Sequence, residues 1–135
     1  MFKLHHIALS VKNLETSIQF YSFFGFKKVL YWEAQDKSLK ITQLKLDEIF
    51  LELFCYPSPQ PLPESAKKLE TDLPEIGIKH FGLKVESIVQ TRKLLIKKGF
   101  ISDVEIIKGR TGVDYFFIKD PNGILLEISE DNRNL

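Results

Sequence analysis

The chain contains one cysteine, one tryptophan and no long hydrophobic run. Cys55 therefore has no partner for an internal disulfide, which is typical of a protein kept in the reducing cytoplasm. The most apolar stretch, IFLELFCY, is interrupted by Glu52 and is far shorter than the roughly 20 residues that cross a bilayer. The segment MFKLHHIALS lacks an apolar signal-peptide core. We therefore expect a cytoplasmic protein with no membrane partner.

Clusters of one charge are also missing. The chain has 19 Lys and Arg against 18 Asp and Glu, and no more than two lysines are adjacent. A protein that binds the phosphate backbone normally carries a basic stripe, so we expect no nucleic-acid partner. In contrast, 44% of the 135 residues are hydrophobic and eleven are phenylalanine. This composition predicts a globular protein with a substantial core.

The two halves of the chain repeat each other. At an offset of 74 residues, KLHHIALSV (3–11) aligns with IKHFGLKV (78–85), which places His6 on His80. The offset then becomes 75, so that IFLELF (49–54) aligns with ILLEIS (124–129) and Glu52 aligns with Glu127. Apolar positions match easily by chance, whereas an ordered match of histidine, glycine and glutamate does not. We interpret the chain as a duplicated module.

Each copy has the pattern of a βαβββ module. Asn13 and Ser87 are suited to cap a helix, and Gly25 and Gly99 are suited to end it. The DPNG sequence at 120–123 predicts a tight turn. Period-two alternation predicts strands at 4–11, 28–34, 39–46 and 49–56, and at 78–85, 103–108, 113–119 and 124–129. The sequence therefore predicts an α+β fold made of two tandem βαβββ modules.

Proline is concentrated between the two copies. The segment 57–75 holds five of the six prolines, which cannot donate to a strand ladder, so it is expected to be a connector. We predict one domain over residues 1–130, with module 1 at about 1–56 and module 2 at about 76–130. The tail, 131–135, is expected to be frayed.

Strand alternation places the two histidines and the two glutamates on polar faces. His6 shares a face with Ala8 and Ser10, opposite the apolar residues that must pack under a helix, and His80 is placed in the same way in the second copy. A carboxylate in an apolar strand is costly unless it is paired or binds metal, which applies to Glu52 and Glu127. Two imidazoles and two carboxylates form a mixed nitrogen and oxygen site for a divalent metal.

Other interpretations of the single residues remain open. A lone histidine in a strand is commonly hydrogen-bonded in a core or at its rim, and a lone glutamate is commonly a solvated edge charge. Cys55 lies in an apolar strand and is more typical of an inert, buried cysteine than of a catalytic thiol. His5 has Lys79 as its counterpart and is expected to point to the opposite face. The fourfold coincidence in a repeat favours the metal site.

Four motifs, HHIALSVKNLETSIQFY…GF, FLELF, IKHFGLKV and KDPNGILLEI, resemble the vicinal oxygen chelate superfamily. This superfamily includes glyoxalase I, bleomycin-resistance proteins, fosfomycin-modifying enzymes, methylmalonyl-CoA epimerase and extradiol dioxygenases. The resemblance covers nearly the whole chain and implies a curved mixed sheet that forms a cup from two half-cups. It implies the metal ligands His6, Glu52, His80 and Glu127, a set similar to that of bacterial glyoxalase I.

The resemblance implies a glyoxalase I-like lyase or isomerase. A divalent metal would stabilise an enediolate, with Glu127 as the proton shuttle and Glu52 as its catalytic partner. Because the chain lacks the insertions of zinc-using glyoxalases, Ni(II) is slightly preferred over Zn(II), Mn(II), Co(II) or Fe(II). Family members often exchange modules between chains, so the resemblance also implies a homodimer.

Some positions depart from bacterial glyoxalase I, which holds glutathione with an arginine and an asparagine. Ser10 stands in place of the arginine, and Tyr56 stands near the position of the asparagine. The candidates for binding a small substrate are therefore Ser10 and, for an anionic group, Lys108 or Arg110. The alternatives are a non-catalytic binding protein of bleomycin-resistance type, an epimerase and a dioxygenase. A dioxygenase would use a three-ligand iron site with open positions, which the fourth ligand argues against.

Overall fold

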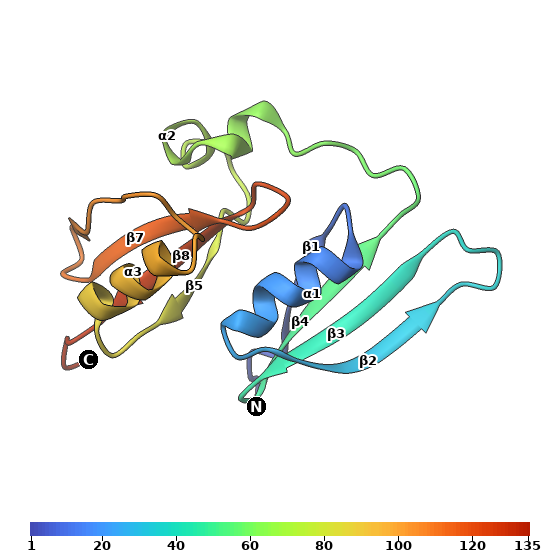
Figure 1. Cartoon of the computed structure of the whole chain (residues 1–135), viewed down its shortest axis with the longest axis horizontal. Coiled ribbons are helices and arrows are strands. Elements are labelled where there is room, and N and C mark those ends of the chain that lie inside the picture. The colour runs from blue at the N-terminus through green and yellow to red at the C-terminus, as the bar shows by residue number, and fades with distance from the viewer. The chain divides into compact units, whose positions relative to one another are not determined.

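The computed structural model describes residues 1–135 and consists of two compact units, Met1–Pro61 and Leu62–Leu135, which are described separately (Figure 1). Unit 1 contains β1 (His6–Ser10), α1 (Leu14–Phe23), β2 (Lys27–Glu33), β3 (Lys40–Leu46) and β4 (Ile49–Cys55). Unit 2 contains a 3-10 helix (Glu64–Lys67), α2 (Leu69–Asp72), β5 (Phe81–Lys84), α3 (Ile88–Lys97), β6 (Ile107–Lys108), β7 (Asp114–Lys119) and β8 (Leu125–Glu130).

The same sheet topology occurs in both units. The strand order is β1-β4-β3-β2 in unit 1 and β5-β8-β7-β6 in unit 2. The first strand of each unit pairs with the last in parallel, and the remaining pairs are antiparallel. Each sheet is therefore mixed, and the predicted α+β fold with two βαβββ modules is confirmed.

Both long helices begin and end as the sequence predicts. In α1, the side chain of Asn13 accepts a hydrogen bond from the Thr16 amide at 2.9 Å. In α3, the Ser87 hydroxyl accepts a longer bond from the Gln90 amide at 3.4 Å. Each helix is followed by a glycine with positive φ, a conformation that a side chain disfavours.

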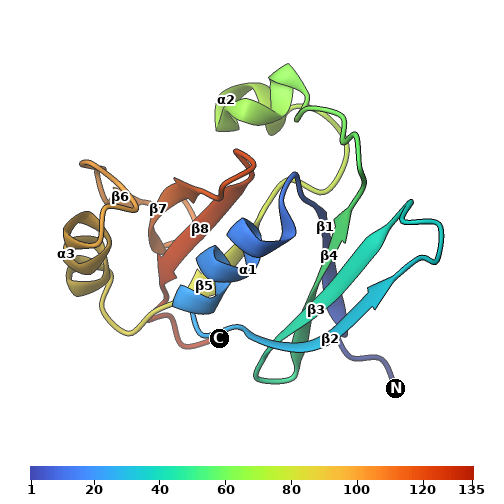
Figure 2. The same ribbon diagram turned by 45° about the vertical axis from the view of Figure 1, so that its right-hand side comes forward.

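One face of each sheet is packed and the other is open. In Figures 1 and 2, α1 lies along one face of the unit 1 sheet. The alternate strand residues on that face form the core together with the buried side of the helix. Its fully or nearly fully buried members are Val11, Leu14, Tyr21, Leu51 and Leu53 in unit 1, and Ile88, Leu95, Phe116, Leu126 and Ile128 in unit 2. The residues between them therefore point to the open face.

The structure differs from the predicted elements at two places in unit 2. The strand predicted at 103–108 is reduced to Ile107–Lys108, because Arg92 binds the backbone carbonyl of Val104 at 2.5 Å and forms an ion pair with Asp103. The predicted connector contains the 3-10 helix and α2, and the latter is held by an ion pair between Lys79 and Asp72 at 3.1 Å. None of the helices has the length and apolarity needed to cross a membrane.

Candidate functional site

His80 and Glu127 meet on the open face of unit 2. His80 immediately precedes β5, and Glu127 lies in the parallel neighbour β8, opposite Gly82. The Nε2 atom of His80 is 2.9 Å from Oε2 of Glu127. Both side chains are about one-fifth exposed, so the pair is accessible but shielded from bulk water. The structure thus brings together one predicted histidine and one predicted glutamate.

The second carboxylate oxygen of Glu127 also has a partner. The Ser129 hydroxyl donates to Oε1 of Glu127 at 2.6 Å. Ser129 is two residues further along β8 and therefore points to the same face. Ser129 was not predicted as a site residue, although its period-two spacing from Glu127 places it on the same face. The two contacts leave the Glu127 carboxylate in a defined orientation.

Packing rather than a second hydrogen bond orients the other side of the His80 ring. The ring forms an edge-to-face contact with Phe117, with centroids 4.8 Å apart. Phe117 is the β7 residue opposite Glu127. The Nδ1 atom of His80 is buried and has no hydrogen-bond partner. Glu127 is therefore the one group that orients this imidazole by hydrogen bonding.

The His80–Glu127 pair suits a divalent metal in both chemistry and spacing. Imidazole nitrogen and carboxylate oxygen bind such ions at about 2.1 Å, so two ligands at right angles lie about 3.0 Å apart. The observed separation is 2.9 Å. The unpartnered Nδ1 atom of His80 is available to carry the ring proton when Nε2 acts as a ligand. These two residues fit as half of a metal site.

The equivalent residues of unit 1 share a face but do not bind each other. His6 lies opposite Phe50, and Glu52 lies opposite Ala8 in the adjacent parallel strand. Glu52 instead accepts a hydrogen bond from the Gln43 amide at 2.5 Å. Gln43 is its neighbour across β3 and β4 and was not predicted, because strand register is needed to find it. A carboxylate with one amide partner keeps its other oxygen available for a ligand.

His5 makes contacts with His6 and with strand β4. Its Nδ1 atom lies 2.9 Å from Nδ1 of His6, and its ring stacks on Phe50 at a centroid distance of 5.1 Å. The His5 carbonyl also accepts a hydrogen bond from the Phe50 amide at 3.0 Å. His5 is therefore a neighbour of the predicted ligand His6.

No group of three or more His, Cys, Asp or Glu side chains lies together in a way that could hold a metal ion. The predicted set is divided between the units, with His6 and Glu52 in unit 1 and His80 and Glu127 in unit 2. A site with four ligands requires the two halves to meet and stays a prediction.

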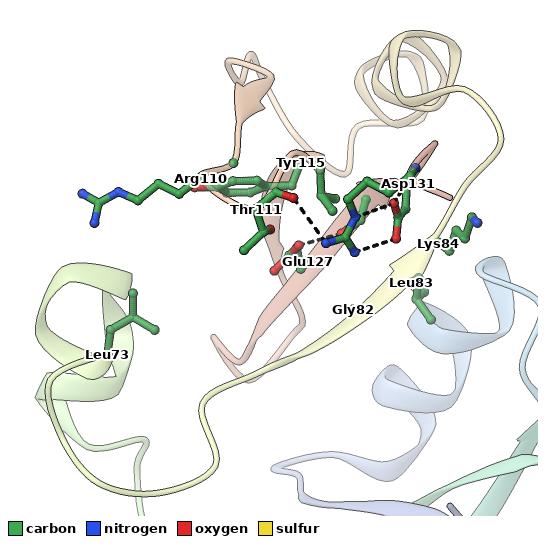
Figure 3. Close-up of a pocket in the computed structure, with 13 residues that line it drawn as sticks. Leu73, Gly82, Leu83, Lys84, Arg110, Thr111, Tyr115, Glu127 and Asp131 are labelled. Carbon is green, nitrogen blue, oxygen red and sulfur yellow. Dashed lines mark hydrogen bonds and ion pairs between the residues drawn. The ribbon is translucent and has the colours of Figure 1, made fainter. Parts of the chain in front are cut away.

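A cavity of about 720 Å³ lies beside Glu127 in unit 2 (Figure 3). Its wall combines the open face of the sheet with the loop that follows β6 and with the end of the chain. The polar members of the wall are Lys84, Arg110, Thr111, Tyr115, Glu127, Ser129, Asp131 and Arg133. The cavity is large enough for a small molecule, and Glu127 faces it.

Of the predicted substrate-binding residues, one lines the cavity and two do not. Arg110 lines it, is exposed and makes no ion pair. Lys108 instead forms an ion pair with Asp114 at 3.0 Å and lies outside the cavity wall. Ser10 is exposed at the end of β1 in unit 1, on the same face as His6. Of the two cations, Arg110 is therefore the one available to a ligand.

Known families and relatives of the chain agree with this architecture. The model of the Glyoxalase/Bleomycin resistance protein/Dioxygenase superfamily matches residues 3–128. The uncharacterized protein YwkD of Bacillus subtilis (strain 168) is 27% identical over 132 residues, which cover 94% of this chain and 95% of that protein.

Solved structures give the same result. The glyoxalase family protein from Enterococcus faecalis is 27% identical, with a TM-score of 0.76 and coverage of 95% of this chain and 97% of that one. The protein SMU.1112c is 26% identical, with a TM-score of 0.79 and coverage of 96% and 99%. With the duplicated βαβββ module and a family match over nearly its whole length, the chain belongs to the glyoxalase/bleomycin resistance protein/dioxygenase superfamily.

Proposed function

We propose that the protein is a metal-dependent lyase or isomerase of glyoxalase I type that acts on a small substrate. The observation that supports this most directly is the contact between His80 and Glu127, at 2.9 Å and beside a cavity. A histidine and a carboxylate at this spacing are an adjacent pair of ligands for a divalent metal. The same pair includes a carboxylate that faces the space where a substrate would lie.

The metal would be held by His6, Glu52, His80 and Glu127, and Ni(II) is preferred over Zn(II), Mn(II), Co(II) or Fe(II). When bound, such an ion supplies Lewis-acid stabilisation of negative charge on substrate oxygens. The chain itself supplies the base. Glu127 accepts a proton from the substrate and returns it to the neighbouring carbon, while Ser129 holds one of its oxygens in place.

Substrate orientation is assigned to the cavity of unit 2. Arg110 is an unpaired cation in its wall, as is Lys84 on β5, and Arg110 would bind an anionic group of the substrate. Glutathione is not required by this arrangement, since Ser10 stands where bacterial glyoxalase I has an arginine. The protein would act in the cytoplasm as a homodimer.

The test is metal binding by protein purified without chelators. We expect elemental analysis after reloading with Ni(II) to give close to one equivalent of metal per chain, with a lower content for Glu127→Ala and His80→Ala. Glu70→Ala is a matched control, because Glu70 is an exposed carboxylate in α2. Less than a tenth of an equivalent of any divalent metal would overturn the proposal. That result would favour the second candidate, a non-catalytic protein that binds a small molecule in the cavity.

A further inference from the structure

The end of the chain forms part of the cavity wall. Asp131 and Arg133 both line the cavity beside Glu127, although they lie beyond the family match, which ends at residue 128. From its sequence alone, this tail is expected to be frayed. The wall therefore extends beyond the part of the chain that the family model matches.

Arg133 joins the tail to the loop that follows β6. Its Nε and Nη2 atoms donate to the two carboxylate oxygens of Asp131, each at 2.8 Å. Its Nη1 atom donates to the backbone carbonyl of Thr111 at 3.3 Å (Figure 3). The hydrogen bonds with Arg133 lower the pKa of Asp131 and raise the pKa of Arg133. We call these three contacts the Arg133 clasp.

The loop held by the clasp, residues 109–112, has a tightly constrained backbone. The Gly109 amide donates to the Val113 carbonyl at 2.7 Å, and the Gly112 amide donates to the Gly109 carbonyl at 2.9 Å. A Cβ atom at Gly109 would lie 2.9 Å from the same Val113 oxygen, which is too close for any side chain. The backbone on both sides of Arg110 is therefore fixed by local bonds, and the clasp attaches it to the tail.

The Arg110 side chain contrasts with its backbone. It is exposed and has no hydrogen bond or ion pair, whereas Arg133 uses its guanidinium for Asp131 and Thr111. In Figure 3, Arg110 extends away from the clasp, on the side of the cavity where Leu73 lies. Because local bonds already hold the loop backbone, the binding of an oxyanion by Arg110 has to order only its side chain.

We propose that Arg133 is a positioning residue for ligand binding in this cavity. By holding the Thr111 carbonyl, it fixes the loop from which Arg110 binds an anionic oxygen group, a carboxylate or a phosphate. The inference rests on the proposed function in that this cavity is taken as the substrate site. The inference gives the tail a role of its own. Arg133 affects ligand binding through the position of Arg110, and it touches no reacting atom.

The test is a titration of the metal-free, full-length protein with inorganic phosphate, and separately with acetate, followed by amide resonances of Gly109, Thr111 and Gly112. We expect saturable shifts of these signals with at least one of the two anions, and Arg110→Gln should weaken the binding by roughly tenfold or more, with the residual binding still measurable. Arg133→Ala should weaken the binding about fivefold, the effect of losing one hydrogen-bonded restraint. Phosphate stronger than acetate would indicate a phosphorylated substrate, and the reverse a carboxylate.

Arg92→Ala is the matched control. Arg92 also binds one carboxylate, Asp103, and one backbone carbonyl, Val104, but it lies outside the cavity wall. We expect anion affinity to be unchanged in this variant. If Arg133→Ala fails to fold, Arg133→Lys is used in its place. A lysine keeps the positive charge but lacks the planar guanidinium that binds Asp131 and Thr111 together. Anion affinity in Arg133→Lys should therefore be lower than in the parent, but higher than in a variant without the charge.

A double-mutant cycle separates positioning from general stability. If Arg133 acts through Arg110, adding Arg133→Ala to Arg110→Gln should have no further effect on the anion-induced shifts. The absence of saturable shifts in the parent, or equal weakening by Arg92→Ala and Arg133→Ala, would overturn the inference. Because the protein is free of metal in this titration, its outcome is independent of the metal analysis that tests the proposed function.

Discussion

The Nε2 atom of His80 lies 2.9 Å from the Oε2 atom of Glu127, although the two residues are 47 positions apart in the chain. The parallel pairing of β5 and β8 brings them together, with Gly82 directly opposite Glu127. The same pairing in unit 1 leaves His6 beside His5, and Glu52 beside Gln43. The duplication is therefore symmetric in fold and asymmetric in side-chain contacts.

Replacing Glu127 by glutamine separates its two proposed roles. Glutamine keeps the size and one ligating oxygen but is not a base, so metal occupancy should fall modestly. Turnover should drop by roughly two to four orders of magnitude, the usual contribution of a positioned acid–base group. Metal content and steady-state rates of the purified variant check this. If Glu127 is a structural charge, both quantities will match the parent.

Removing a histidine ligand should affect metal content directly. His80→Ala and His6→Ala each delete a proposed ligand without a substitute, so metal affinity and activity should be lost together. His5→Ala is the control, because His5 lies beside His6 but is not a proposed ligand. Isothermal titration with Ni(II) measures the affinities. Equal affinity in the three variants and the parent would exclude the site.

The proposed assembly is a homodimer, because members of the superfamily often dimerise. Light scattering at micromolar concentration should give twice the mass of one 15.7 kDa chain. A monomeric mass would contradict this expectation, and the metal site would then have to form within one chain.

The Arg133 clasp should persist into moderately acidic solution. Hydrogen bonds from Arg133 lower the pKa of Asp131, so the stabilisation is fully present above the usual aspartate pKa of about 3.9. It is lost only as the pH falls through the lowered, folded-state value. Carbon-detected titration of the Asp131 carboxyl should show this depressed midpoint, and Arg133→Ala should raise it toward the ordinary value. An unchanged midpoint in the variant would mean that Arg133 does not hold Asp131.

Capping of α1 can be tested without any ligand. Asn13→Ala removes the acceptor of the Thr16 amide bond at 2.9 Å and should lower the free energy of unfolding by about 1 kcal/mol. Asn13→Asp keeps an acceptor and should be nearly neutral. Urea denaturation followed by circular dichroism gives both values. Equal destabilisation by the two substitutions would show that the side-chain oxygen is not the stabilising group.

Local patterns in the sequence determined the secondary structure and the faces of the strands. Asn13 and Ser87 begin the two long helices because short-range hydrogen bonds to the backbone need only neighbouring residues. The period of two placed His6 on the open face, because alternation is a property of a single strand. The strand predicted at 103–108 is shorter in the structure, because Arg92 in α3 donates a hydrogen bond to the Val104 carbonyl.

Tertiary structure decided which side chains meet. Period two assigns a residue to a face but not to a neighbour, since the neighbour depends on the register between strands that are far apart in the chain. Register gave Glu127 the partner His80 and gave Glu52 the partner Gln43. No local sequence pattern predicts the contact between Arg133 and Thr111. A polar tail alone predicts fraying. In the structure, however, the Arg133 side chain binds a backbone carbonyl that lies 22 residues away in the chain.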